Sequence, residues 1–290
     1  MTQSTPPQTP WTAAEARACI RLPTAHDHKY TRGVLGVVTG SRRYPGAAVL
    51  TTAAALATGL GMVRFYPDAA HADLAKLVLQ RSPEVVVAPG KVHAWLLGSG
   101  VAPAGGGSWS DWLRHRQMTA TRAQAAPTVL DAGALHLAGT LRAPTLITPH
   151  AGELATLLSV RGVPVSHRAI AADPLHWAAL AQQTLGVTVL LKGAHTVVAG
   201  DGVCITLAPS TPWLATAGTG DVLAGIVGAL VATWHQELAN QLALMAQLAA
   251  TGAYIHARAA DKASGGGPLT TTALIDSIAQ VVGELLGAQE

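Results

Sequence analysis

Charged side chains are scarce in this chain of 290 residues, since Asp, Glu, Lys and Arg together make up only 12% of it. Aromatic residues are also few, at 4% by the Phe, Trp and Tyr count. The formal net charge is +3, and the 19 Lys and Arg residues are scattered rather than clustered in a stripe. Without a basic surface or aromatic platforms for stacked bases, the sequence argues against nucleic acid as a partner.

Cysteine is nearly absent. Cys19 and Cys204 lie far apart and form no CxxC pair, which excludes a disulfide framework and a thiolate metal site. This usage favours a reducing compartment.

Long apolar runs and leader segments are missing as well. The residues from Met1 to Pro10 are polar and rich in proline, unlike a signal or transit peptide, and we predict a disordered tail over residues 1–12. The longest strongly apolar run, from Val222 to Ala232, is well short of the ~20 residues that span a bilayer. We therefore expect a soluble, cytoplasmic protein with no membrane partner.

What the chain does have is hydrophobic content of 49%, enough for one large core. Apolar runs predict strands at residues 34–38, 62–66, 84–88, 127–131, 144–148, 187–191, 197–199 and 203–207, and a further run ends at Leu97. Helical patterns alternate with them, at residues 12–19, 47–58, 69–80, 109–124, 174–185, 221–233, 240–260 and 270–286. This alternation predicts an α/β fold with a mostly parallel sheet covered by helices on both faces, in a single domain of residues 13–290.

The most informative stretch runs from Thr216 to Asp221 and leads into a helix that is apolar on every face. Such a helix must be buried, so its N-terminus presents unpaired N–H groups to the interior and favours an anion there. Gly218 and Gly220 would let a phosphate approach the backbone closely. Asp221 is either a helix cap or a catalytic base that tolerates a neighbouring phosphate.

Other functional side chains follow predicted strands. Asp131 ends one strand, either facing a site or capping a turn, and Lys192 ends another before a glycine. His150 opens a helix at a third strand end, although a lone His is usually an ordinary loop residue. The carboxyl ends of parallel strands meet at one edge, so we expect these residues to share a crevice. The expected proximity of His150 and Lys192 to Asp221 favours the interpretation of Asp221 as a catalytic base.

Two further clusters invite weaker interpretations. The His26-Asp27-His28 run lacks a third ligand at metal spacing and is interpreted as loop, so we predict no protein metal site from it. The Arg42-Arg43 pair follows the first strand and is either a contact for dinucleotide phosphates or solvated surface.

Four motifs in order resemble the ADP/ATP-dependent NAD(P)H-hydrate dehydratases, repair enzymes of the ribokinase-like superfamily. They are Gly40-Ser41 with Tyr44-Pro45-Gly46-Ala47-Ala48, then Thr148-Pro149-His150-Ala151-Gly152-Glu153, then Lys192-Gly193-Ala194-His195-Thr196, and finally Ala217-Gly218-Thr219-Gly220-Asp221-Val222-Leu223-Ala224-Gly225. The resemblance runs from about residue 28 to 286. The chain departs from the family where Gly98-Ser99-Gly100 replaces Gly-Pro-Gly and where Asp131-Ala132-Gly133 replaces Asp-Ala-Asp.

The resemblance implies a ribokinase-like fold and two adjoining sites. Ala47, Gly100, His150 and Asp221 would bind hydrated NADH or NADPH. The adenine nucleotide would be held by Lys192, Gly193, Ala194, His195 and Thr196, together with Gly218, Thr219 and Gly220. Asp221 would be the catalytic residue.

The implied reaction is a phosphorylation followed by elimination. Asp221 would accept the proton of the substrate hydroxyl, with Mg²⁺ and the glycine amides stabilising the transferred phosphoryl group. The resemblance favours ADP over ATP as phosphoryl donor, and it implies a homotetramer and an epimerase on a separate chain. A small-molecule kinase of the same superfamily and a non-catalytic dinucleotide-binding module remain alternatives.

Overall fold

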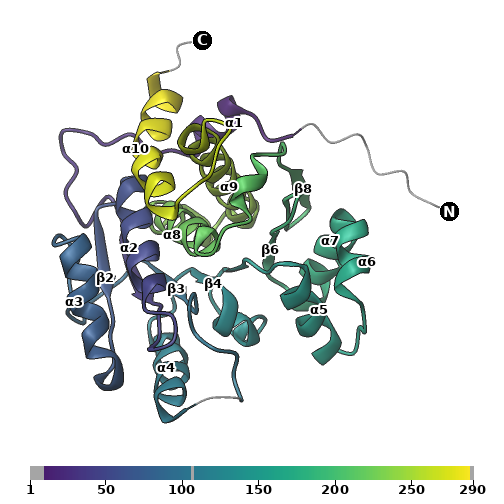
Figure 1. Ribbon diagram of the computed structural model, residues 1–290, viewed down its shortest axis with the longest axis horizontal. Helices are drawn as coiled ribbons and strands as arrows, with labels where there is room; N and C mark the ends of the chain where they lie inside the picture. Colours follow the sequence, from purple (N-terminus) through teal and green to yellow (C-terminus); the bar gives the residue numbers. More distant parts are fainter. Residues whose placement is uncertain (1–9, 106–107, 288–290) are drawn as a thin grey trace.

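A single eight-stranded sheet forms the centre of the computed structural model, which describes residues 10–105 and 108–287 (Figure 1). The strands are β1 (Val34–Val38), β2 (Met62–Phe65), β3 (Ala94–Leu97), β4 (Thr128–Leu130), β5 (Thr145–Ile147), β6 (Thr188–Leu191), β7 (Val197–Gly200) and β8 (Val203–Thr206). Their order is β2-β1-β3-β4-β5-β6-β7-β8. Strands β1 to β6 pair in parallel, whereas β7 and β8 add an antiparallel hairpin. The predicted mostly parallel sheet is confirmed.

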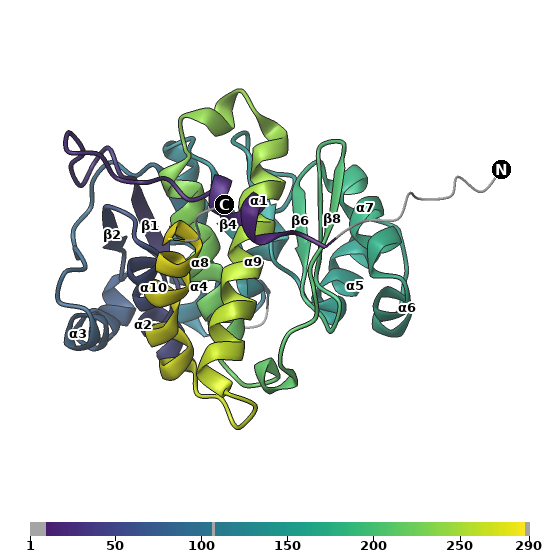
Figure 2. The same cartoon turned by 90° about the horizontal axis from the view of Figure 1, so that it is seen from above.

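Helices cover both faces of this sheet, because the strands bury side chains on both sides. In β1, Leu35 and Val37 belong to one core, and Val34 and Val38 belong to the other. The first core packs against α1 (Ala13–Ala18), α2 (Gly46–Thr58), α3 (Ala72–Arg81), α8 (Thr219–Thr233), α9 (Leu242–Ser264) and α10 (Thr271–Gly287). The second packs against α4 (Trp109–Ala120), α5 (Ala151–Val160), α6 (His167–Ala172) and α7 (Pro174–Leu185). Figure 2 shows α9 and α10 side by side.

Short 3₁₀ turns join several of these elements. They are η1 (Ala69–His71), η2 (Thr121–Ala123), η3 (Ala132–Leu137), η4 (Pro212–Leu214) and η5 (Glu237–Ala239). The helix predicted over 109–124 is accordingly α4 followed by η2.

Helix α8 is buried along nearly its whole length, as its apolar sequence predicts. It packs closely on α2, where a Cβ added to Gly225 would lie only 2.5 Å from the carbonyl oxygen of Thr51. A larger residue at this position would push the two helices apart. This close packing fixes the start of α8 relative to the start of α2.

Two expectations from the sequence need correction. Residues 84–88 form no strand, and only Val86 makes an isolated bridge, to Arg64 of β2. Beyond Val86 the carbonyls of Ala88 and Pro89 accept hydrogen bonds from the Arg64 guanidinium instead of from a neighbouring strand. At the N-terminus, the backbone N–H of Trp11 donates to the carbonyl of Thr206, so the folded part begins before the predicted boundary at residue 12. The rest of the predicted tail, residues 1–9, lies outside the described residues.

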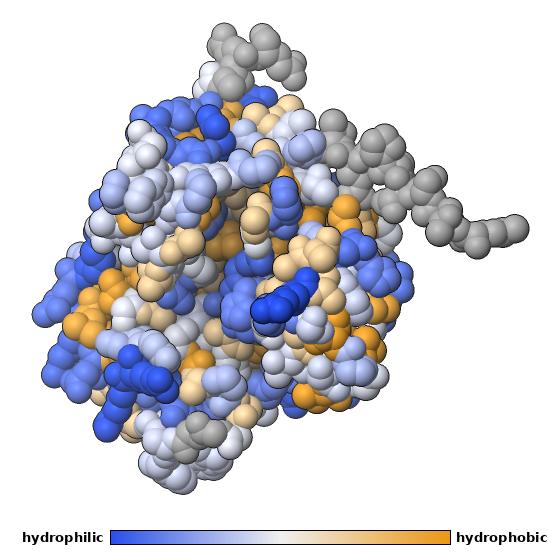
Figure 3. All heavy atoms as spheres, turned by 45° about the vertical axis from the view of Figure 1, so that its right-hand side comes forward, coloured by the Kyte–Doolittle hydropathy of each residue, from blue (hydrophilic) through white to orange (hydrophobic). Residues whose placement is uncertain are grey.

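The surface is mixed in polarity. Figure 3 shows small apolar patches among hydrophilic residues on one face, which is hollowed near its middle. Within the described ranges, none of the helices combines the length and apolar character that crossing a membrane requires.

Candidate active site

Asp221 lies in the first turn of α8, directly behind a glycine turn. The N-cap of this helix is Gly218, whose φ of 91° lies in the left-handed region, and no side-chain hydrogen bond caps the helix among the described residues. The cap interpretation of Asp221 is therefore wrong, because the carboxylate stands at the third helical position and Gly218 occupies the cap. The side chain is left available for a ligand.

The environment of Asp221 suits it to accept a proton near neutral pH. Burial raises the pKa of Asp221 most, the negative charge of Asp131 raises it too, and the ammonium of Lys192 lowers it, so that the pKa stands at about 7. A base with a pKa near the working pH is partly deprotonated and still strong enough to take a proton. Such a shifted carboxyl group at the start of a buried helix marks a candidate catalytic site.

Asp131 is the hub of the polar network at this edge. It is only 3% exposed, and its carboxylate accepts hydrogen bonds from Lys192 Nζ at 2.9 Å, Thr148 Oγ1 at 2.8 Å and Ser99 Oγ at 2.9 Å. These donors come from the ends of three other strands, β6, β5 and β3. A buried carboxylate is stable only with such partners, so Asp131 holds four strand ends together.

Lys192 links this hub to the start of α8. A Cβ added to Gly220 would lie 3.5 Å from its Nζ, so the ammonium group sits beside the glycine turn. Burial alone lowers the pKa of Lys192, but the nearby carboxylates of Asp131, Glu153 and Asp221 outweigh it and raise the pKa above its usual value. The lysine therefore carries a permanent positive charge at the helix N-terminus, where a phosphate group would lie.

The first turns of α2 lie between two other glycines. A Cβ added to Gly100 would lie 2.3 Å from the Cβ of Ala47, and one added to Gly218 would lie 2.7 Å from Leu50. Gly100 also has a φ of 67°, which L side chains rarely adopt. The predicted substrate residues Ala47 and Gly100 are thus in contact, and α2 connects them to the glycine turn of α8.

His150 is the N-cap of α5. Its Nδ1 accepts hydrogen bonds from the backbone N–H groups of Gly152 and Glu153, while the Glu153 carboxylate accepts one from the His150 N–H. With Nδ1 used as an acceptor, a neutral ring carries its proton on Nε2. The side chain is 61% exposed, so Nε2 can donate to a ligand. His150 also forms an isolated parallel bridge with Lys192, which places it at the same edge.

The segment from Lys192 to Thr196 forms the turn between β6 and β7. Gly193, Ala194 and His195 are exposed there, and the hydroxyl of Thr196 donates to the carbonyl of Gly193. Thr219 differs, since its hydroxyl donates to the carbonyls of Leu214 and Thr216 and holds the glycine turn in shape. The turn offers exposed backbone and hydroxyl groups beside Lys192.

This geometry agrees with what comparison of the sequence shows. A family model described as NAD(P)H-hydrate dehydratase matches residues 35–280. The chain belongs to the NAD(P)H-hydrate dehydratase family.

Two relatives illustrate the membership. The bifunctional NAD(P)H-hydrate repair enzyme Nnr of Mycobacterium tuberculosis is 40% identical over 227 residues, which cover 76% of this chain and 45% of that protein. The ADP-dependent (S)-NAD(P)H-hydrate dehydratase of Xanthomonas campestris is 32% identical over 262 residues, 86% of each chain. The chain spans about half the length of the bifunctional relatives that it matches.

Solved structures agree on the fold. The ADP/ATP-dependent NAD(P)H-hydrate dehydratase of Bacillus subtilis superposes with a TM-score of 0.79 at 23% identity, covering 97% of this chain and 100% of that one. A ribokinase-like superfamily protein of Enterococcus faecalis gives a TM-score of 0.80 at 20% identity, covering 99% and 100%. The ribokinase-like fold predicted for this dehydratase family member is confirmed.

The two departures from the family motifs have physical explanations in this dehydratase family member. The Ser99 hydroxyl donates to Asp131, adding a bond that a proline cannot make. A Cβ on Gly133 would lie 2.5 Å from the carbonyl oxygen of Val101, so this position is too tightly packed for any side chain. Asp131 keeps its hydrogen bonds to Ser99, Thr148 and Lys192 despite the departure at Gly133.

Sequence reasoning underrated Asp131 and missed Ser99 and Thr148. The position of Asp131 at a strand end was the available signal, but its three hydrogen bonds join residues 17 to 61 positions apart. For the Arg42-Arg43 pair, the contact with dinucleotide phosphates stays a prediction. Arg42 donates to the carbonyl of Ala70, and the Arg43 guanidinium lies over the Tyr44 ring. A surface hollow of about 490 Å³, lined by residues 121, 122, 124–126, 128 and 140–143, contains none of the predicted site residues.

Proposed function

We propose that this chain is an ADP-dependent (S)-NAD(P)H-hydrate dehydratase, which phosphorylates the hydroxyl of hydrated NADH or NADPH and then eliminates phosphate. The observation that carries the proposal is Asp221, a carboxylate with a pKa of about 7 at the glycine-lined start of a buried helix, beside Lys192. Family membership supplies the substrate class.

Asp221 acts as the general base. Its carboxylate takes the proton of the substrate hydroxyl as that oxygen attacks the terminal phosphorus of the nucleotide, whose own phosphoanhydride bond breaks. Base catalysis of this kind contributes typically about 10²–10⁴ in rate. Phosphate is a far better leaving group than hydroxide, so the lone pair of the ring nitrogen then expels it. Loss of a proton from the adjacent ring carbon restores the reduced nicotinamide.

Charge on the transferred phosphoryl group is balanced by this chain's own donors. The backbone N–H groups of Gly218, Thr219 and Gly220 stand at the positive end of the α8 dipole, and the Lys192 ammonium lies beside them. The exposed turn from Lys192 to Thr196 holds the adenine nucleotide, while Ala47, Gly100 and His150 bind the hydrated dinucleotide.

The donor set also suits Mg²⁺, which prefers oxygen ligands and is commonly held by one or two carboxylates together with nucleotide phosphates. The carboxylates of Asp131, Glu153 and Asp221 all raise the pKa of Lys192, so three carboxylates lie around its ammonium group. The described residues hold no group of three or more His, Cys, Asp or Glu side chains arranged for a metal ion, so phosphate oxygens would complete the shell. The ion would neutralise charge on the phosphoryl group.

One assay separates this function from its alternatives. The protein is incubated with hydrated NADH, Mg²⁺ and either ADP or ATP, and the return of reduced-nicotinamide absorbance is followed together with free phosphate. A dehydratase yields both signals, with ADP giving the faster rate. A stable phosphoester without free phosphate would identify a small-molecule kinase, and no turnover with either nucleotide would leave a binding module.

We also propose that the chain assembles as a homotetramer in the cytoplasm. Trp109 and Trp112 of α4 support assembly. Their rings stack with centroids 4.5 Å apart, and the two residues are 70% and 47% exposed. Exposed aromatic surface of this kind is typical of subunit contacts. The epimerase that the resemblance implies would act from outside this domain. Light scattering tests the assembly, with a monomeric mass as the contradicting result, and cell fractionation tests the location.

A further inference from the structure

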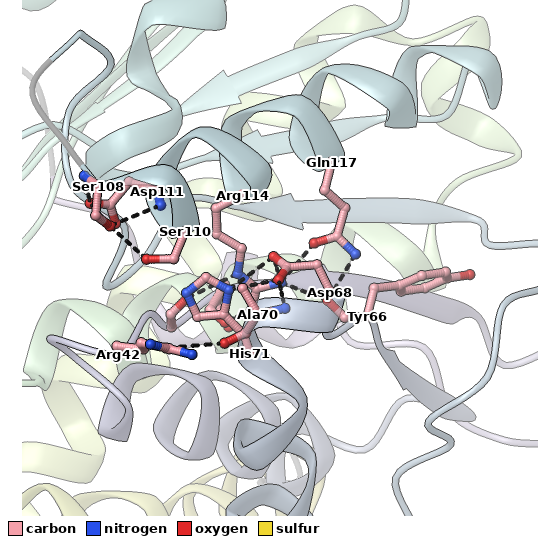
Figure 4. Close-up of polar contacts among 12 residues, drawn as sticks. Arg42, Tyr66, Asp68, Ala70, His71, Ser108, Ser110, Asp111, Arg114 and Gln117 are labelled. Atoms are coloured by element: carbon pink, nitrogen blue, oxygen red, sulfur yellow. Dashed lines mark hydrogen bonds and ion pairs between the residues drawn. The ribbon is translucent and has the colours of Figure 1, made fainter.

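Arg114 of α4 is buried completely, and it is the only Lys or Arg among the described residues with a buried side chain. A buried guanidinium needs hydrogen-bond acceptors for its N–H groups. Arg114 donates from Nε to the carbonyl of Gly40 at 3.0 Å, from Nη2 to that of Thr39 at 2.5 Å, and from Nη1 to that of Tyr66 at 2.7 Å. Figure 4 shows this side chain reaching from α4 into the polar cluster below it.

The three carbonyls belong to the ends of two neighbouring strands. Thr39 and Gly40 follow β1, and Tyr66 follows β2. The rigid fork of a guanidinium can bind several carbonyl oxygens in fixed directions, whereas the point charge of a lysine cannot. Arg114 thereby sets the relative position of both strand ends and of the loop that follows Gly40.

The loop that follows Gly40 leads into α2 and lies next to Ala47, one of the predicted substrate residues. The N–H of Gly40 donates to the carbonyl of Ser99 at 2.7 Å. A Cβ added to Gly100 would lie 3.3 Å from the Cα of Gly40, so these two glycines and Ala47 meet at one point. A shift of Gly40 must therefore disturb the contact between Gly100 and Ala47.

The positive charge of Arg114 is balanced on the same side. An oxygen of Asp68 lies 3.9 Å from Nη1, and the Asp68 carboxylate is held in place by the N–H of Ala70 and by Nδ1 of His71. Burial lowers the pKa of Arg114 and the Asp68 carboxylate partly opposes that change, so that the pKa stands at about 10. The guanidinium accordingly keeps its charge and all its donors at neutral pH.

We propose that Arg114 is a positioning residue for the dinucleotide half of the site, acting through the carbonyls of Thr39 and Gly40 and touching no substrate itself. The proposal rests on the proposed function for the identity of the ligand. The nucleotide half is built from the Lys192 turn and the Gly218 turn, which Arg114 does not contact. Loss of Arg114 should therefore weaken binding of the dinucleotide and spare that of ADP.

The test compares Arg114→Lys with Arg161→Lys in the full chain. Arg161 also donates to a backbone carbonyl, that of Ala138, but it lies at the far end of α5 from His150. Measured quantities are KM for hydrated NADPH, KM for ADP, and the Kd values of NADPH and ADP by fluorescence and calorimetry. We expect Arg114→Lys to raise both dinucleotide constants about tenfold or more, the loss expected from one or two hydrogen bonds. The ADP constants should change less than about twofold, and Arg161→Lys should change neither set.

Equal weakening of both ligands would overturn the proposal, because it would indicate a purely structural role, and so would unchanged dinucleotide binding. If Arg114→Lys fails to fold, Asp68→Asn decides, since it loosens Arg114 while leaving the carbonyl acceptors in place. It should raise the dinucleotide constants in the same selective way, and unchanged constants would contradict the proposal. A wild-type protein without turnover would refute the proposed function separately, and the NADPH and ADP Kd values would still test Arg114.

Discussion

The Nζ of Lys192 donates a hydrogen bond of 2.9 Å to Oδ1 of Asp131, and the same ammonium group lies beside Gly220 at the start of α8. The two partners act in opposite directions on Asp221, because Asp131 raises its pKa and Lys192 lowers it. Burial adds the largest increase, and the sum leaves the pKa of Asp221 at about 7. The strength of the proposed base is thus set by its burial and by two residues that follow strands β4 and β6.

Replacing the proposed base should remove most of the turnover and preserve nucleotide binding. Asp221→Asn keeps the size of the side chain but cannot accept the hydroxyl proton, so we expect kcat to fall by about 10²–10⁴. The Kd for ADP by calorimetry should change little. Asp276→Asn is the matched control, since Asp276 pairs with Arg81 on the surface. Turnover of Asp221→Asn near that of the control would remove Asp221 from its assigned role.

The rate should depend on pH through the same group. Asp221 works as a base only when deprotonated, so kcat/KM should rise with pH and level off above its pKa of about 7. The raised pKa of Lys192 keeps the lysine charged throughout this range. Asp131→Asn removes a charge that raises the pKa of Asp221 and releases Lys192 to lower it further. The rising limb of this variant should shift to lower pH, and an unshifted or opposite limb would contradict the coupling.

The ionised carboxylate of Asp221 should also lower the free energy of unfolding above neutral pH. Its pKa rises from 3.8 to about 7 on folding, so between these values the folded protein holds a proton that the unfolded chain has lost. The stabilisation from that proton is complete at low pH and is lost as the pH rises toward 7. Asp221→Asn escapes this loss and should be about 2 kcal/mol more stable than wild type at pH ~8, after allowance for solvent screening. Urea unfolding at pH ~8 and pH ~4 checks this, since the gain should shrink at the lower pH.

The fold was largely predictable because its signals are local. Alternating apolar and amphipathic segments place the strands and helices, and the all-apolar sequence after Asp221 identifies a buried helix. The strand predicted over residues 84–88 was wrong because an apolar run beside a sheet edge has the same sequence pattern whether or not it pairs along its length. The local pattern thus predicts which helices and strands exist, but it does not predict where a strand at the sheet edge ends.

The site was predictable at the level of strand ends but not of contacts. Parallel strands bring Asp131, His150 and Lys192 to one edge whatever their partners are. The bonds from Ser99 and Thr148 to Asp131, and those from Arg114 to Gly40, connect residues far apart in the chain. A single sequence contains no mark of such pairs, so the supporting network had to come from the structure.

The close contact between Gly100 and Ala47 should make the substrate site sensitive to any side chain at position 100. Gly100→Ala places a Cβ 2.3 Å from that of Ala47 at a φ of 67°, so α2 must shift away. We expect KM for hydrated NADPH to rise about tenfold or more, and the ADP Kd to change less, because in the described part of the chain α2 touches the nucleotide side only through Leu50 beside Gly218. Gly162→Ala is the control, because its φ of 79° carries a similar backbone cost of about 1 kcal/mol while a Cβ there meets nothing within 4 Å. Equal KM values for the two variants would show that the contact does not shape the substrate site.

Removing Lys192 should separate its structural role from its chemical one. Lys192→Met leaves the carboxylate of Asp131 buried without its cation, which should destabilise the protein by about 3 kcal/mol, whereas Lys262→Met at the surface should cost less than about 1 kcal/mol. Adding Asp131→Asn to Lys192→Met removes the unpaired charge, so the double variant should regain much of that stability in urea unfolding. Its ADP Kd should stay at least about tenfold weaker than wild type, because no cation then faces the nucleotide phosphates. Recovery of ADP binding along with stability would mean that Lys192 serves only to pair with Asp131.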